Sequence, residues 1–140
     1  MSLLERIRAV LVRKPDLSND MAVGRAGEAA AAKHLQSRGY RILNRNWTCP
    51  AGELDLVCAK NDTIVFVEVK ARLSNAAAEP EDNITPAKRR KLEALARAWL
   101  DARGKPDFAY RFDAVSVVFT DGTPTLNHIE EAFIPKFDYR

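Results

Sequence analysis

The order of apolar and polar residues along the chain predicts two core helices and five strands. An alanine-rich run, with polar residues before it and Gly39 after it, predicts a helix over residues 20–38. Short stretches dense in β-branched and aromatic residues and bounded by turn residues predict strands. These stretches cover residues 40–46, 53–59, 64–70, 112–119 and 125–133.

A second helix is predicted between the third and fourth strands. Thr85 can cap its start, Pro86 suits its first turn, and Gly104 marks its end. Apolar residues recur at helical spacing and predict a buried stripe. They are Leu92, Leu95, Ala96, Trp99 and Leu100. The order of one helix, three strands, one helix and two strands indicates one mixed α/β domain over residues 20–140.

Residues 1–19 are predicted to form an amphipathic segment and a connector ahead of that domain. Leu3, Leu4 and Ile7 follow helical spacing, but the uninterrupted apolar run is only residues 9–12. This run is too short for a signal peptide or a membrane span, so we expect no export and no stable membrane association. Packing on the core or on a partner chain is the favoured role, with a membrane surface or nucleic acid as the alternatives.

Composition describes an ordinary globular chain of 140 residues, 46% of them hydrophobic and 29% charged. A chain of this length can bury a sufficient core without disulfides or a structural metal. The two cysteines and two histidines lack the paired spacing of a zinc site. We therefore expect free thiols and a reducing, cytoplasmic compartment.

The net charge of +3 conceals an alternation along the chain. Residues 1–50 carry nine basic and four acidic side chains, and residues 51–85 carry three and seven. Residues 86–111 carry eight and three, which leaves two and five for residues 112–140. Two basic stretches around an acidic one fit a surface that meets a polyanion, although charge spread over a solvated surface gives the same count.

Strand periodicity brings candidate catalytic residues together. Glu68 and Lys70 share one face of their strand. In the preceding strand Glu53, Asp55 and Val57 are predicted to share a face opposite Leu54, Leu56 and Cys58. If the two strands form a hairpin, register can bring Asp55 beside Glu68.

Two adjacent carboxylates need a positive charge between them, and a divalent cation supplies one. Oxygen ligands without histidine or thiolate suit Mg²⁺ or Mn²⁺, which can assist hydrolysis of a phosphodiester. In such a site Asp55 and Glu68 bind the metal, and Lys70 orients water or stabilises charge on the phosphate. The alternative is a surface salt bridge, since Glu-x-Lys is common on strands.

Three motifs resemble the bacterial YraN family of restriction-endonuclease-like PD-(D/E)xK proteins, which is similar to archaeal Holliday-junction resolvases. They are Gly24-Arg25-x-Gly27-Glu28, Gly52-Glu53-Leu54-Asp55-Leu56 and Phe66-Val67-Glu68-Val69-Lys70-Ala71-Arg72. The similarity extends over residues 24–135 and includes the helix start at Thr85 and Arg111-Phe112-Asp113. It implies an α/β fold with a mixed β-sheet flanked by helices.

The resemblance also implies roles for single residues. Asp55 and Glu68 match the acidic metal-binding residues, Lys70 matches the lysine, and Glu28 matches an acidic residue of the resolvase-like branch. Leu54 stands where the superfamily name has proline. Nucleic-acid contacts are assigned to Arg25, Arg72, Lys88 and Lys91, with a solvated face as the alternative for the two lysines.

We therefore expect a Mg²⁺-dependent endonuclease acting on structured, branched or single-stranded DNA. The alternative is a non-catalytic nucleic-acid-binding module that keeps the nuclease fold. Homodimerisation is open, because enzymes that cut two strands related by symmetry act as dimers. A salt bridge between Arg111 and Asp113 is favoured over a metal-binding role for Asp113.

Overall fold

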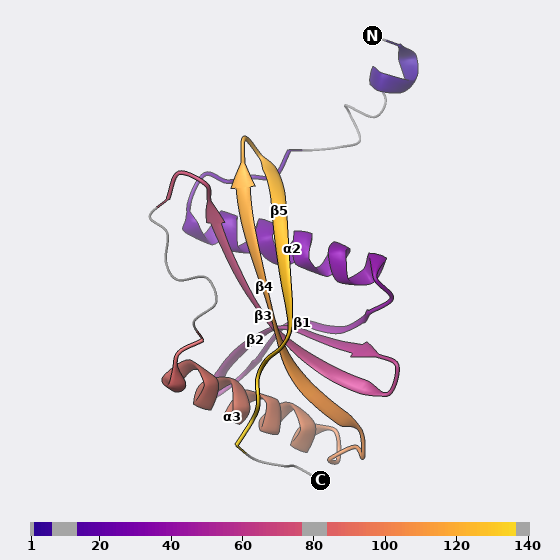
Figure 1. The fold of residues 1–140 in the computed structure, drawn as a ribbon, viewed down its shortest axis with the longest axis vertical. Helices are drawn as coiled ribbons and strands as arrows, with labels where there is room; N and C mark the ends of the chain where they lie inside the picture. Colours follow the sequence, from indigo (N-terminus) through magenta and orange to yellow (C-terminus); the bar gives the residue numbers. More distant parts are fainter. Residues whose placement is uncertain (1, 7–13, 77–83, 137–140) are drawn as a thin grey trace.

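The computed structural model describes residues 2–6, 14–76 and 84–136 as a sheet covered by a helix on each face (Figure 1). The elements follow one another along the chain in the predicted order of types. They are α2 (Asp20–Ser37), β1 (Arg41–Cys49), β2 (Gly52–Lys60), β3 (Thr63–Leu73), α3 (Pro86–Ala102), β4 (Ala109–Thr120) and β5 (Thr123–Phe133).

The five strands lie side by side in the order β1-β2-β3-β4-β5. Neighbouring strands are antiparallel except β3 and β4, which run parallel. Parallel neighbours need a long crossover, and α3 supplies it by returning the chain across one face of the sheet. The sheet is therefore mixed.

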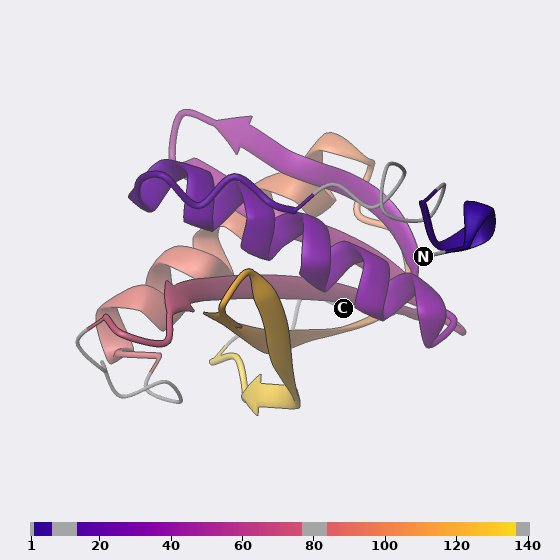
Figure 2. The ribbon, with the colours of Figure 1, turned by 90° about the horizontal axis from the view of Figure 1, so that it is seen from above.

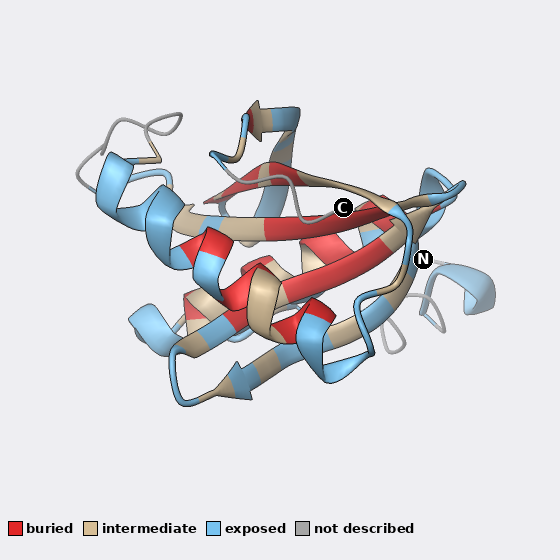
Figure 3. Cartoon of the chain, turned by 90° about the horizontal axis from the view of Figure 1, so that it is seen from below, coloured by how far each residue is buried: buried red, intermediate tan, exposed pale blue. Residues whose placement is uncertain are grey.

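The two helices lie on opposite faces of the sheet (Figure 2). Each helix buries its own apolar layer against the sheet. On the α2 face, Leu35 packs with Val65 and Val117. On the α3 face, Leu95 and Trp99 pack with Phe66. Buried residues accordingly follow the middle strands and the sheet-facing sides of the helices (Figure 3).

Helix α2 lies very close to the sheet because its inner face carries small residues. Its start is capped by Asn19, whose side chain accepts a 2.9 Å hydrogen bond from the N–H of Ala22. Further along, Gly27 packs on β3 so tightly that a Cβ atom at this position would lie 2.3 Å from the Cβ of Ala71. This contact sets the height of the next residue, Glu28, above the sheet.

Helix α3 begins and packs as its sequence predicts. The Thr85 side chain accepts a 3.2 Å hydrogen bond from the N–H of Lys88, and Pro86 occupies the first turn. The helix ends at Ala102, ahead of Gly104 with its φ of +73°. All five residues of the predicted apolar stripe are buried: Leu92, Leu95, Ala96, Trp99 and Leu100.

The structure differs from the sequence prediction in the end of strand β3 and in the side of the sheet to which one β2 residue points. Strand β3 runs on to Leu73, beyond the predicted end at residue 70, because its pairing with β4 continues to Phe119. In β2 the predicted common face of Leu54 and Leu56 is wrong. Leu54 packs on the α3 face and Leu56 on the α2 face, a change of side that coincides with the end of the β2–β3 ladder at Leu56.

The N-terminal segment is described only in part. Residues 3–6 form a helical turn with Leu3 and Leu4 exposed, whereas the remainder of the predicted amphipathic pattern, residues 7–13, lies outside the described residues. Leu17 packs against the α2-face core. No helix within residues 2–6, 14–76 and 84–136 combines the length and apolarity that crossing a bilayer requires.

Candidate metal and nucleic-acid site

The candidate site lies where β2 and β3 separate. Their ladder ends at the pair Leu56 and Val67, and the next residues beyond it, Asp55 and Glu68, are close enough for the side chain and charge of Glu68 to raise the pKa of Asp55. The register predicted from the hairpin is thus confirmed. Beyond that point a side chain takes the place of the backbone hydrogen bonds between the strands: Oδ2 of Asp55 accepts a 2.9 Å hydrogen bond from the N–H of Val69.

Three carboxylates converge at this point of the sheet. One oxygen from each of Glu28, Glu53 and Asp55 lies within 4.8 Å of the others. Helix α2 contributes Glu28, and β2 contributes the other two. Glu53 is a member that the sequence interpretation missed, although its two-residue spacing from Asp55 on one strand face was a usable signal.

Asp55 is the most strongly perturbed of these acids. Its pKa is raised from 3.8 to about 8, first by burial and then by the charge of Glu68, against the opposing hydrogen bond from Val69. Burial also raises the pKa of Glu28, while a hydrogen bond with Asn46 lowers it. Burial thus favours the protonated forms of Asp55 and Glu28 over their charged forms.

Glu68 is held by a lysine from the start of α3. The Nζ of Lys88 lies 2.8 Å from Oε1 of Glu68. Burial alone would lower the pKa of Lys88, but the hydrogen bond and charge of Glu68 raise it above 10.5. Lys88, predicted to contact nucleic acid or to lie on a solvated face, thus contacts a candidate metal ligand directly.

Lys70 lies two residues after Glu68 on β3 and is exposed. Strand geometry directs these two side chains from the same face. The exposed position leaves Lys70 accessible to a large ligand such as a nucleic-acid backbone. Its predicted role in catalysis stays a prediction.

The other three residues assigned to nucleic acid differ in their surroundings. Arg25 is exposed on α2, near enough to Glu28 for its charge to lower the pKa of that acid. Lys91 is exposed on α3 and lies against Gly52, where a Cβ atom would be 3.1 Å from its Cε. Arg72 is half-buried, and its Nη1 lies 3.4 Å from the carbonyl of Leu73. Arg25 and Lys91 therefore border the acidic cluster.

Asp113 belongs to a separate polar network between β4 and β5. The Nε of Arg111 donates a 3.0 Å hydrogen bond to its Oδ1, which confirms the predicted salt bridge. His128 lies 2.8 Å from Oδ2, and the N–H of Glu131 donates to Oδ1 at 3.0 Å. Burial alone would raise the pKa of Asp113, but these hydrogen bonds together lower it.

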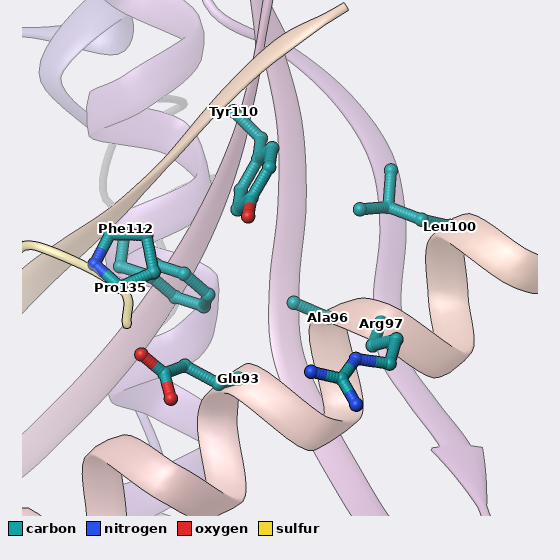
Figure 4. A pocket seen from close by; sticks show the side chains of 7 residues that line it. All are labelled: Glu93, Ala96, Arg97, Leu100, Tyr110, Phe112 and Pro135. Atoms are coloured by element: carbon teal, nitrogen blue, oxygen red, sulfur yellow. The ribbon is translucent and has the colours of Figure 1, made fainter. Parts of the chain in front are cut away.

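A small cavity lies between α3 and the start of β4 (Figure 4). Its lining includes Glu93, Arg97 and Tyr110. A volume of about 10 Å³ admits at most one water molecule. Glu93 is buried, and one of its carboxylate oxygens accepts a 2.7 Å hydrogen bond from the N–H of Lys136, so its role here is structural.

The fold and the position of the acidic residues together define a class of protein. A mixed five-stranded sheet flanked by helices, with acidic residues where its second and third strands part, is a restriction-endonuclease-like α/β fold. Residues 27–117 match the uncharacterised protein family UPF0102, which is the YraN group of restriction-endonuclease-like proteins. The chain belongs to this family.

Several family members match most of the chain. A UPF0102 protein of Anaeromyxobacter dehalogenans is 46% identical over 112 residues, which cover 80% of this chain and 84% of that protein. One from Nitratidesulfovibrio vulgaris is 48% identical over the same length and coverage. A third, from Syntrophomonas wolfei, is 44% identical over 79% of this chain and 96% of its own length. The family match over residues 27–117 includes both the acidic cluster and α3.

Proposed function

We propose that this protein is a divalent-metal-dependent endonuclease that hydrolyses phosphodiester bonds in structured, branched or single-stranded DNA. The observation that carries the proposal is the position of Asp55, which lies beside Glu68 where β2 and β3 part. Its pKa of about 8 means that the Asp55 carboxyl of metal-free protein is mostly protonated at neutral pH. A bound cation would stabilise the charged carboxylate and so favour its ionisation.

The donor set suits Mg²⁺ or Mn²⁺. Every candidate ligand is a carboxylate oxygen, and hard oxygen ligands match these ions better than zinc or copper. Asp55 would hold the ion together with Glu68, whose charge raises the pKa of Asp55, and oxygens of Glu28 and Glu53 lie within 4.8 Å of an Asp55 oxygen. A bound divalent ion supplies positive charge that polarises a phosphoryl oxygen.

Side chains and backbone groups of the protein would orient the ligands and bind the nucleic acid. The hydrogen bond from the N–H of Val69 fixes the Asp55 carboxylate, so one oxygen is oriented before any ligand arrives. Lys70, exposed on the same strand face as Glu68, would orient the attacking water or stabilise charge on the phosphate. Arg25, Arg72, Lys88 and Lys91 would hold the backbone on either side.

The test is cleavage of labelled branched, flapped, single-stranded and linear DNA, with Mg²⁺, Mn²⁺ or chelator. We expect cleavage only with metal, and loss of at least about a hundredfold in rate for Glu68→Gln and Lys70→Ala. A matched control, Glu131→Gln, changes the same chemical group at an exposed position outside the site and should keep full activity.

Binding measurements separate the enzyme from its alternative. Both site variants should still bind DNA, because the substitutions remove few backbone contacts. If the wild-type protein binds DNA but cuts no substrate with either metal, the chain is a non-catalytic nucleic-acid-binding module and the enzymatic proposal fails. Protein that neither binds nor cuts any of these DNAs contradicts both functions.

A further inference from the structure

A second, larger pocket lies at the opposite end of α3 from Lys88. Its volume of about 430 Å³ falls within the roughly 300 to 1,000 Å³ typical of small-molecule sites. Its lining comes from the start of β1, the β2–β3 turn, the end of α3 and the segment before β4. The residues used below are Arg41, Leu43, Asp62, Trp99, Arg103 and Phe108.

Two apolar side chains of this lining are exposed. Phe108 is 50% exposed and Leu43 is 41% exposed, although both are large and hydrophobic. An aromatic ring open to solvent beside a hollow offers a flat surface on which a planar ligand can stack. The pocket therefore favours a ligand with a flat, partly apolar body.

The charged groups of the pocket favour an anion. Arg41 and Arg103 line it together with a single acid, Asp62. Two guanidinium groups against one carboxylate leave a positive balance. Guanidinium groups also match the geometry of phosphate oxygens better than ammonium groups do.

Arg103 is held in place before any ligand arrives. Its Nη2 donates a 2.9 Å hydrogen bond to Oδ1 of Asn44, and its guanidinium lies 4.0 Å from the centroid of the Trp99 ring. The same Asn44 oxygen accepts a 2.8 Å hydrogen bond from Nε1 of Trp99. Within the described part of the chain these partners are uncharged, so the positive charge of Arg103 is not neutralised by them.

Two basic residues, one near each end of α3, contact the β1–β2 hairpin. Lys91 lies against Gly52 near the acidic cluster, and Arg103 lies on Asn44 at the pocket. Lys88 and Arg103 are separated by about 22 Å along the helix, at a rise of about 1.5 Å per residue. A stacked strand, rising about 3.4 Å per nucleotide, covers that distance with roughly six nucleotides.

We propose that this pocket receives one unpaired nucleotide of the same nucleic-acid strand whose phosphodiester lies at the acidic cluster. The base packs on Phe108 and Leu43, and its phosphate contacts Arg41 and Arg103. The pocket thereby selects substrates with a single-stranded segment some six nucleotides from the scissile bond. This inference rests on the proposed function for the identity of the ligand.

The test measures binding of fluorescently labelled oligothymidylate by anisotropy, in chelator so that no cleavage occurs. For an oligomer of about twelve nucleotides, we expect Phe108→Ser to weaken affinity between about fivefold and a hundredfold. Arg41→Gln should weaken it and reduce its salt dependence. Phe108→Tyr keeps a stacking ring and should bind like wild type.

Two control variants change the same kinds of group outside the pocket. Ile134→Ser removes another exposed apolar side chain, one that is 79% exposed, and Lys33→Gln removes an exposed charge on α2. Neither should alter affinity by more than about twofold. Equal affinity for wild type, Phe108→Ser and Arg41→Gln would overturn the inference, whether or not the protein cuts DNA.

Competing ligands identify the source of the nucleotide. Thymidine monophosphate should displace the long oligomer only at much higher concentration, because it lacks the contacts near the acidic cluster. Displacement by the mononucleotide at concentrations as low as those of unlabelled oligomer would overturn the placement of a strand. Weaker binding by the pocket variants in a protein that never cleaves would support the inference while the enzymatic proposal fails.

Discussion

Gly27 of α2 lies so close to Ala71 of β3 that no side chain fits between them. A Cβ atom on Gly27 would be 2.3 Å from the Cβ of Ala71, well inside van der Waals contact. The next residue along the helix is Glu28, whose carboxylate reaches Asp55 across the same interface. A packing contact between helix and strand therefore sets the geometry of the acidic cluster.

Replacement of Gly27 by alanine is expected to damage both stability and the site. The added methyl group must push α2 from the sheet, at a cost of about 1 to 3 kcal/mol in the free energy of unfolding. Glu28 moves with the helix, so affinity for Mn²⁺ should fall as well. Denaturant unfolding and calorimetric titration measure the two effects.

Gly24 provides the matched control for this substitution. It lies on the same helix, but a Cβ atom there would have nothing within 4 Å. Gly24→Ala should therefore be neutral or stabilise the helix by up to about 1 kcal/mol, the usual gain in propensity. Equal destabilisation by both variants would contradict the close-packing explanation.

The ionisation of Asp55 predicts how stability depends on pH. Its pKa in the folded protein is raised from 3.8 to about 8 by burial and by the charge of Glu68, so the folded state binds this proton more tightly than the unfolded chain. The resulting stabilisation is complete below about pH 4 and is lost as the pH rises toward 8. Metal-free protein should therefore become less stable across this range.

Asp55→Asn should remove most of the fall in stability that metal-free protein shows as the pH rises. In chelator at pH 8, we expect the free energy of unfolding of this variant to exceed that of wild type by at least about 1.4 kcal/mol, the equivalent of one pKa unit. Mg²⁺ should raise the melting temperature of wild type but not that of the variant. Melting curves between pH 4 and 8, with and without metal, test both statements, and a flat wild-type profile in chelator would contradict the raised pKa.

Lys88 and Lys70 are expected to have separable roles. Because Lys88 forms a 2.8 Å ion pair with Glu68, its ammonium competes with a cation for that carboxylate. Lys88→Ala should therefore bind Mn²⁺ about two- to tenfold more tightly, yet bind DNA more weakly for lack of its charge. Lys70→Ala should leave metal affinity within about twofold and reduce cleavage.

Calorimetric titration with Mn²⁺ and anisotropy with DNA distinguish these two lysines. Lys33→Ala, which removes an exposed lysine of α2, should alter neither metal affinity nor cleavage. Unchanged metal affinity in Lys88→Ala would show that its ion pair with Glu68 does not compete with the metal.

Asp113 predicts a different pH dependence from that of Asp55. Although burial opposes it, hydrogen bonds from His128, Arg111 and the Glu131 backbone lower the pKa of Asp113 below 3.8. This carboxylate thus stabilises the fold above pH 3.8, and its contribution is lost as the pH falls through the lowered pKa. Asp113→Asn should lower the free energy of unfolding by about 3 kcal/mol at pH 7, since it leaves the partly buried guanidinium of Arg111 without its counterion.

Unfolding by urea at pH 7 and pH 3 tests the role of Asp113. The difference between variant and wild type should shrink at the lower pH. Asp121→Asn, an exposed change in the β4–β5 turn, should stay within about 0.5 kcal/mol of wild type at both values. A pH-independent loss in Asp113→Asn would indicate packing damage instead of a missing charge.

The sequence by itself determined the local elements and the main acidic pair. Caps at Asn19 and Thr85, the apolar stripe of α3 and the hairpin between β2 and β3 are interactions between residues close in the chain. The hairpin register, which ends at Leu56 and Val67 and brings Asp55 beside Glu68, follows from a short turn. The family resemblance identified the same residues, and the match over residues 27–117 confirms the family.

Only the tertiary structure decided which distant groups meet in the site. Glu28 joins the cluster because glycine lets α2 approach β3, and Lys88 meets Glu68 because α3 crosses back over the sheet. Neither contact follows from periodicity, which fixes directions within one element but not distances between elements. The change of face between Leu54 and Leu56 was missed for the same reason, since it depends on where the β2–β3 ladder ends.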